Sequence, residues 1–273
     1  MLIMGALKYI LIVLGIIVIG VLGTAGYFYN SLSKTVDAQL HIESGYVQVN
    51  GNSVTGNVKL RQGDVVETSN GLATIILHES VLISLNENTK TTLEDLLLKH
   101  PKISQETGKS WNKFTRLSGV EGYSIKDSES VASVRSTAFQ FSNGKLIGFE
   151  GEVDYNIADT DFVVEERKVV EIVDGIPVKR DITAEELAEV KQSLERQERE
   201  LKYLRELEVK KYTFIINKFT TEETVMETLE QADSGEKDIE ELRKLVPVKI
   251  KSTQKVVDLT NKIKETKQQI ESL

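Results

Sequence analysis

The sequence predicts a single N-terminal transmembrane helix, then an all-β domain, then a C-terminal α-helical hairpin or bundle. Three observations predict this order: an uninterrupted apolar run near the N-terminus, short strand-like runs separated by Gly, Asn and Asp, and apolar residues at heptad spacing near the C-terminus. The expected boundaries are residues 1–8 for a short cytoplasmic tail, 9–29 for the transmembrane anchor, 30–38 for a linker, 39–156 for the β domain, 157–182 for a linker with a β-hairpin, and 183–273 for the helical region.

The apolar run over residues 9–29 is 21 residues long and contains no charged side chain. A helix needs about 20 residues to cross the hydrocarbon core of a bilayer. The alternative is a secretory signal peptide that is cleaved at the small residues 23–25. Both interpretations predict that the rest of the chain is exported. The positive-inside rule leaves the orientation open, because Lys8 and Lys34 flank the run on opposite sides.

Composition excludes several classes of function. A net charge of -8 argues against a nucleic-acid binder, since neutralising phosphates needs a basic face. One small basic cluster, Lys109, Lys113 and Arg116 around Trp111, is interpreted as a solvated loop. The chain has no cysteine, which excludes disulfides, a thiolate nucleophile and a cysteine-based zinc site.

The β domain is expected from alternating runs separated by turn residues. Asn-Gly pairs at 50–51 and 70–71 are strong hairpin signals, because both positions of such a turn require positive φ. A final hairpin over residues 169–178 is expected to turn at Asp174 and Gly175. Short strands with a turn signal about every ten residues are typical of a sandwich, a barrel or a solenoid. The other expected strands are 45–50, 56–60, 65–68, 72–77, 81–85, 122–125, 131–141 and 146–155.

Several of these segments resemble the FecR domain in their order and spacing. Segments 131–139 and 149–153 are similar to the family's closing pattern, in which an Arg-Gly-Thr-x-Phe strand precedes a strand that ends Glu-Gly-x-Val. The resemblance spans residues 39–156, about two fifths of the chain. The segments are 63–68, 71–77, 81–89, 103–111, 124–125, 131–139 and 149–153.

The resemblance implies an extracytoplasmic module on a single-pass tether that senses or binds another protein. It also assigns Arg135, Thr137, Phe139 and Gly151 to a motif that holds the fold together. In that role the planar guanidinium of Arg135 would satisfy neighbouring carbonyls or a carboxylate.

The sequence departs from the family pattern in two places. Residues 78–80 are His-Glu-Ser where the family has Asp-Gly-Ser, and Ser136 replaces the glycine of Arg-Gly-Thr. In the best-known members a cytoplasmic head controls a sigma factor. Only about eight residues precede the apolar run here, so we expect no such head and no sigma-factor control.

The C-terminal region is expected to be helical. Thr183 and Glu186 form a capping box at a helix start, Thr221 can cap a second helix, and residues 234–235 (Ser-Gly) break it. Two apolar seams, each with one polar member, suit an antiparallel hairpin within one chain or a coiled coil between chains, in which Gln197 would face Gln197. The possible oligomer seam is Leu187, Val190, Leu194, Gln197, Leu201 and Leu204, and the later seam is Val256, Leu259, Ile263, Thr266, Ile270 and Leu273.

The sequence predicts binding and not catalysis. His41, His78 and His100 fall in different expected elements, so we expect no catalytic residue, no metal site, no cofactor and no small-molecule substrate. The predicted function is a membrane-tethered extracytoplasmic module, periplasmic or at the cell surface, that senses a signal through contact with an envelope protein or with itself. The alternative is a structural envelope protein that oligomerises through its C-terminal helices.

Overall fold

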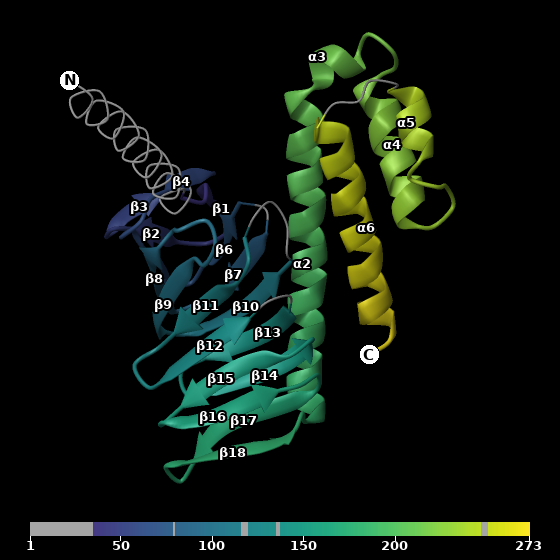
Figure 1. The fold of residues 1–273 in the computed structure, drawn as a ribbon. Helices are drawn as coiled ribbons and strands as arrows, with labels where there is room; N and C mark the ends of the chain where they lie inside the picture. The colour runs from purple at the N-terminus through teal and green to yellow at the C-terminus, as the bar shows by residue number, and fades with distance from the viewer. Residues whose placement is uncertain (1–34, 79, 116–119, 135–136, 247–250) are drawn as a thin grey trace, which may run out of the picture. The chain divides into compact units, whose positions relative to one another are not determined.

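The structure is a computed structural model that describes residues 35–78, 80–115, 120–134, 137–246 and 251–273 (Figure 1). It divides into two compact units, Met1–Lys179 and Arg180–Leu273. The first is built of β-strands and is called the β unit below. The second contains α-helices and is called the helical unit.

The predicted fold class needs one correction, which concerns the membrane-spanning helix. Within the residues described, no helix is both long and apolar enough to cross a membrane. The two longest helices have 28 and 21 residues, but charged side chains occur throughout both of them. Residues 9–29, to which that helix was assigned, lie outside the described part of the chain. The fold described is therefore a β-rich part followed by helices.

The β unit consists of two nine-stranded sheets. The first sheet contains, in spatial order, β18 (Ile176–Asp181), β17 (Lys168–Val173), β14 (Lys145–Glu150), β13 (Thr137–Ser142), β10 (Lys109–Phe114), β7 (Val81–Leu85), β6 (Leu72–Leu77), β1 (Ala38–Ser44) and β4 (Val58–Leu60). The second sheet contains β16 (Thr160–Val164), β15 (Val153–Ile157), β12 (Ser130–Val134), β11 (Tyr123–Lys126), β9 (Lys102–Thr107), β8 (Thr89–Asp95), β5 (Val65–Thr68), β2 (Val47–Val49) and β3 (Asn52–Val54).

The chain passes repeatedly from one sheet to the other, and both sheets grow along the same direction as the sequence proceeds. Neighbouring strands are antiparallel except β9 and β11, which are parallel. Residues 157–182, expected as a linker with a hairpin, contribute β16, β17 and β18 to these sheets. The expected hairpin is confirmed, with positive φ at both Asp174 and Gly175.

The two Asn-Gly pairs behave differently. Asn50 and Gly51 both have positive φ and join β2 to β3, as predicted. Gly71 does not turn a hairpin, because β5 and β6 belong to different sheets. Instead it lies against the backbone near Gly45, where a Cβ atom on Gly71 would be 2.8 Å from the Ser44 carbonyl oxygen. Glycine is required there because two crossing segments approach too closely for a side chain.

The core of the β unit draws apolar residues from both sheets. Ile75, Ile83, Phe139 and Phe141 from the first sheet and Tyr155 from the second are almost completely buried in one cluster. Each such side chain contributes roughly 1.5–3 kcal/mol when it leaves water. In the second sheet β12 alternates buried and exposed residues, which is typical of a sheet with one face in the core and one in solvent.

The helical unit contains α2 (Ala184–Lys211), α3 (Thr213–Ile216), α4 (Glu222–Asp233), α5 (Glu241–Leu245) and α6 (Lys251–Glu271). Helices α2 and α6 lie side by side along most of their length (Figure 1). The predicted capping box at Thr183 and Glu186 is confirmed. So are the cap at Thr221 and the end of α4 just before residues 234–235.

Candidate functional site

Three of the four residues assigned to the fold-holding motif, Thr137, Phe139 and Gly151, lie in or next to β13 and β14. Thr137 begins β13 and Phe139 is completely buried in the core. Gly151 has a φ of 69° at the bend between β14 and β15, a conformation that favours glycine. Arg135 lies outside the described residues. The three described positions therefore serve packing and backbone geometry.

The basic cluster around Trp111 is not the solvated loop that was expected. Residues 109–114 form β10, in which Trp111 is buried and its ring centroid lies 5.8 Å from that of Phe149. The ammonium of Lys113 forms an ion pair with Glu150 and is nearly buried. Arg116 lies outside the described residues.

The possible oligomer seam belongs to α2, which packs against α6 of the same chain. Val190, Leu194 and Leu201 are buried, whereas Leu187 and Leu204 are half-buried. The Gln197 side-chain amide donates a hydrogen bond of 3.1 Å to the Thr266 hydroxyl of α6. The polar members of the two seams thus meet each other within one chain, which is the hairpin alternative left open by the sequence.

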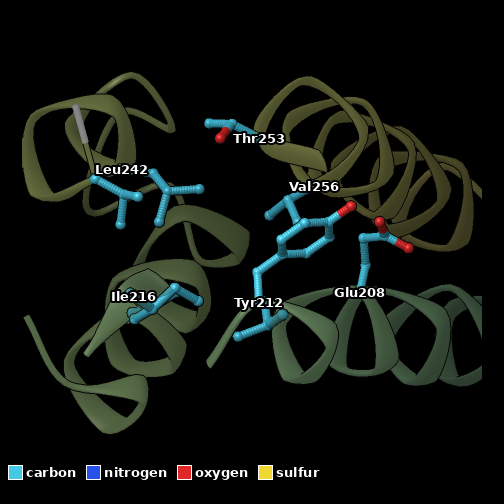
Figure 2. A pocket seen from close by; sticks show the side chains of 9 residues that line it. Glu208, Tyr212, Ile216, Leu242, Thr253 and Val256 are labelled. Carbon is cyan, nitrogen blue, oxygen red and sulfur yellow. The ribbon is translucent and has the colours of Figure 1, made fainter. Parts of the chain in front are cut away.

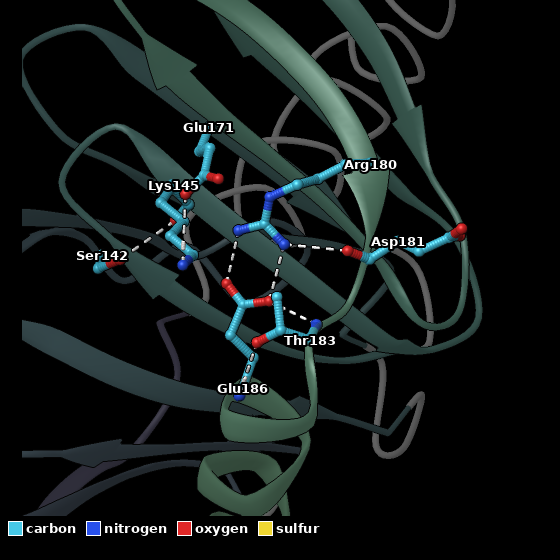
Figure 3. Close-up of polar contacts among 7 residues, drawn as sticks. All are labelled: Ser142, Lys145, Glu171, Arg180, Asp181, Thr183 and Glu186. Atoms are coloured by element: carbon cyan, nitrogen blue, oxygen red, sulfur yellow. Dashed lines mark hydrogen bonds and ion pairs between the residues drawn. The ribbon is translucent and has the colours of Figure 1, made fainter.

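The start of α2 is held by the Glu186 carboxylate, which accepts three hydrogen bonds. Glu186 accepts a hydrogen bond from the Thr183 amide and two from the Arg180 guanidinium, at 2.8 and 2.7 Å (Figure 3). The Thr183 hydroxyl in turn accepts from the Glu186 amide. This bidentate pair strengthens the capping box and secures the first turn of the helix.

The described residues contain two hollows that could be considered as binding sites. The first, in the helical unit, has a cavity volume of about 30 Å³ and an apolar lining (Figure 2). That is about the volume of one water molecule in the liquid, so this hollow cannot hold an organic ligand. Its lining residues are Glu208, Val209, Tyr212, Ile216, Val225, Leu242, Val246, Thr253 and Val256.

The second hollow is a polar, open cleft of about 490 Å³ between turns of the β unit. Its central carboxylate, Asp127, accepts hydrogen bonds from the amides of Glu129, Ser130 and Gly144. Lys145, which also lines the cleft, pairs with Glu171 at 3.3 Å (Figure 3). These polar groups are used to hold the turns together. Among the residues that the structure describes, no group of three or more His, Asp and Glu could hold a metal ion.

The candidate functional site is an exposed apolar surface on the hairpin of β17 and β18. Val173, Ile176 and Val178 are 44 %, 64 % and 38 % exposed, and we call these three residues the hairpin patch. The two-residue turn places Val173 opposite Ile176, so that strand alternation puts all three on one face. Val170 and Ile172 point the other way, into or against the core.

The surroundings of the hairpin patch favour contact through side chains. The neighbouring Glu171 on β17 forms its ion pair with Lys145 and supplies a polar rim. β18 is an edge strand, and Pro177 within it has no N–H group to offer to another strand. Lys179 donates to the Val163 carbonyl of β16 at 2.7 Å, and its side-chain hydrogen bond to Glu165 lowers the pKa of the Glu165 carboxyl. Apolar surface with a polar rim is typical of protein-contact sites.

Sequence reasoning found the turn of this hairpin but missed the patch. The available signal was the alternation Ile-Pro-Val after Gly175, with a proline that marks an edge strand. The pattern alone could not tell which face of the hairpin lies in the core.

No family model matches the sequence, and no curated protein matches it. Two crystal structures of a candidate anti-sigma factor from Parabacteroides distasonis ATCC 8503 are similar, each with 11 % identity over 45 % of this chain. The TM-scores are 0.39 and 0.40, and the matches cover 61 % and 62 % of those chains, less than two thirds of their length. A likeness at this level establishes neither a shared fold nor a shared function.

Proposed function

We propose that this chain is a signal-sensing module that acts outside the cytoplasm by binding another protein. The observation that carries the proposal is the hairpin patch, where three exposed apolar side chains lie together at the edge of a sheet. The resemblance of residues 39–156 to the FecR domain supports the same kind of role. The partner we expect is an envelope protein, bound by the side chains of β17 and β18.

Contact of this kind predicts an apolar partner surface. The core of a protein interface is depleted in charge, while its rim is polar. Val173, Ile176 and Val178 would form the centre, and the ion pair of Lys145 with Glu171 would lie at the rim. We favour this over the alternative of a structural protein that oligomerises through its helices, because α2 packs against α6 of the same chain and Gln197 of its seam donates to Thr266.

The test is site-specific photo-crosslinking in the native organism. A photoreactive residue at Ile176 or Val178 should give one defined adduct, and the exposed position Ser53 on β3 is the matched control. Ile176→Ser should abolish the adduct formed from position 178. Adducts that are the same from Ser53, or their absence from both hairpin positions, would exclude the hairpin patch as the binding surface.

Location has its own test because the chain has no native cysteine. A single Ser53→Cys substitution should react with a membrane-impermeant maleimide in intact cells. Labelling that occurs only after lysis would contradict a position outside the cytoplasm.

A further inference from the structure

A second exposed apolar feature lies at one end of the helical unit, where α2 passes into α3 (Figure 1). We call residues 209–221 the α3 tip. Within it Tyr212 and Ile216 line the small apolar hollow (Figure 2), whereas Phe214 and Phe219 are 77 % and 51 % exposed. Packing within the helical unit explains why Tyr212 and Ile216 are apolar, but it does not explain the exposed rings of Phe214 and Phe219.

The α3 tip is also basic within an acidic chain. It contains Lys210, Lys211 and Lys218 and no acidic residue, whereas the whole chain has a net charge of -8. The Lys218 ammonium lies 4.8 Å from the centre of the Phe214 ring. Lysine beside exposed aromatic residues on a short protruding helix is the combination that favours an anionic lipid surface.

We propose that the α3 tip binds the surface of an anionic lipid bilayer, with Phe214 and Phe219 entering the headgroup region. The rings would leave water for the boundary between headgroups and acyl chains, and the lysines would contact lipid phosphates or carboxylates. We assign the tip to a bilayer and not to a protein partner because its exposed apolar area is small. Two aromatic rings bury roughly 150–250 Å² each, far below the roughly 800 Å² per partner of a stable protein complex.

Of the acidic residues that flank the tip, Glu206, Glu208 and Glu222 are engaged in local contacts, and Glu223 is exposed. Glu206 pairs with Lys210 at 2.5 Å, and Glu208 accepts from Lys211 and from Lys255 of α6 at 2.9 and 2.7 Å. Glu222 accepts a hydrogen bond from the Thr213 hydroxyl. Lys210 and Lys211 remain more than half exposed. The pair of Lys210 with Glu206 is exposed on both sides and such pairs are weak, so Lys210 can turn toward lipid at little cost. The Glu208 carboxylate is buried, but its second pair with Lys255 leaves it a counter-charge when Lys211 turns toward lipid.

The experiment uses the full chain with one introduced cysteine, Asn217→Cys, labelled with an environment-sensitive fluorophore. Vesicles of phosphatidylcholine with phosphatidylglycerol should shift its emission to the blue, and brominated lipid should quench it. Pure phosphatidylcholine vesicles should have a much smaller effect. The same label at Ser133→Cys, on the exposed face of β12, is the positional control and should not respond.

Substitutions then assign the response to the tip. Phe214→Ala with Phe219→Ala should abolish it, and Lys218→Gln should weaken vesicle binding about fivefold. Val163→Ala, which shortens an exposed apolar side chain on β16, should leave it unchanged. Helical ellipticity should be the same in all variants, since these side chains lie outside the core.

Three results would overturn the inference: an equal response to neutral and anionic vesicles, no response at position 217, or a response that survives loss of both rings. A fourth would be an absent vesicle response together with a concentration-dependent dimer that the double Phe variant abolishes. That outcome would assign the tip to a second copy of this chain. None of these results affects crosslinking from the hairpin patch, so the two proposals fail separately.

Discussion

A buried polar chain of three residues connects the two sheets of the β unit. The Tyr123 hydroxyl of β11 donates to the Asn112 side-chain carbonyl of β10 at 2.8 Å, and the Asn112 amide donates to the Ser110 hydroxyl at 2.9 Å. All three side chains are buried, and burial raises the pKa of the Tyr123 phenol well above its ordinary value. The phenol therefore stays protonated and remains a donor. A hydrogen bond requires a defined geometry, so this contact fixes how the two sheets align. Apolar packing alone tolerates more variation in that alignment.

Tyr123→Phe should destabilise the β unit by about 1–3 kcal/mol, because the Asn112 carbonyl would stay buried without its donor. The free energy of unfolding from urea titration measures the change. Tyr46→Phe is the matched control, since Tyr46 is 44 % exposed and loss of its hydroxyl should cost less than about 0.5 kcal/mol. Equal costs for the two variants would mean that the polar chain contributes nothing specific.

Single residues also show where sequence reasoning ends. Asn50 and Gly51 turn a hairpin as their dipeptide predicts, but Asn70 and Gly71 lie where the chain crosses between sheets. Both pairs have the same local preference for a turn. What separates them is the close approach of Gly45 to Gly71, a contact between segments distant in sequence. Local pattern therefore predicts strands and turns, and it leaves the assignment of strands to sheets open.

At the scale of elements, the α2 seam illustrates the same limit. The heptad spacing correctly gave the buried face of α2, including Val190, Leu194 and Leu201. It could not give the partner of that face, since an apolar stripe fits another chain as well as it fits α6. The hydrogen bond from Gln197 to Thr266 matches the hairpin within one chain, a pairing that the spacing of α2 could not predict. The hairpin patch was missed for a related reason, because exposure depends on what covers a face.

A buried ion pair joins three helices of the helical unit. The positions of its residues in the sequence did not predict it. Arg205 of α2 forms two hydrogen bonds, at 2.6 and 2.7 Å, with Asp233 at the end of α4, and a third with the Thr260 hydroxyl of α6. Both charged side chains are at most 4 % exposed. The Arg205 Nε atom is also buried and has no hydrogen-bond partner. The pair is therefore incompletely compensated for its loss of water.

Arg205→Met should destabilise the helical unit by about 3–5 kcal/mol, because the Asp233 carboxylate would remain buried without its counter-charge. Adding Asp233→Leu should recover most of this loss, since an apolar pair can replace a buried ion pair at little net cost. Ellipticity at 222 nm during urea unfolding measures both changes. Lys210→Met, which removes the exposed pair with Glu206, is the control and should change stability by less than about 1 kcal/mol.

If the double variant is no more stable than Arg205→Met, the geometry of the ion pair itself holds the three helices together. That result would contradict the argument from incomplete compensation.

At the scale of the whole molecule, each unit has its own apolar core. One cluster includes Ile83 and Phe139 of the β unit, and another includes Leu229 and Leu242 of the helical unit. The change of composition near residue 183 lies close to the boundary between Lys179 and Arg180. Composition indicates such a boundary because strand-like patterns occur before residue 183 and helical spacing occurs after it. It gives no information about how strongly the two units unfold together.

Separate cores predict two unfolding transitions that different probes can follow. The single tryptophan, Trp111, lies in β10 and reports the β unit, whereas ellipticity at 222 nm is dominated by the helices. Leu229→Ala should cost about 2–5 kcal/mol and lower the midpoint of the ellipticity transition, with the tryptophan transition unchanged. Ile83→Ala should do the reverse. If either substitution moves both midpoints equally, the two cores unfold as one cooperative system, and the helical unit cannot respond to a signal independently of the β unit.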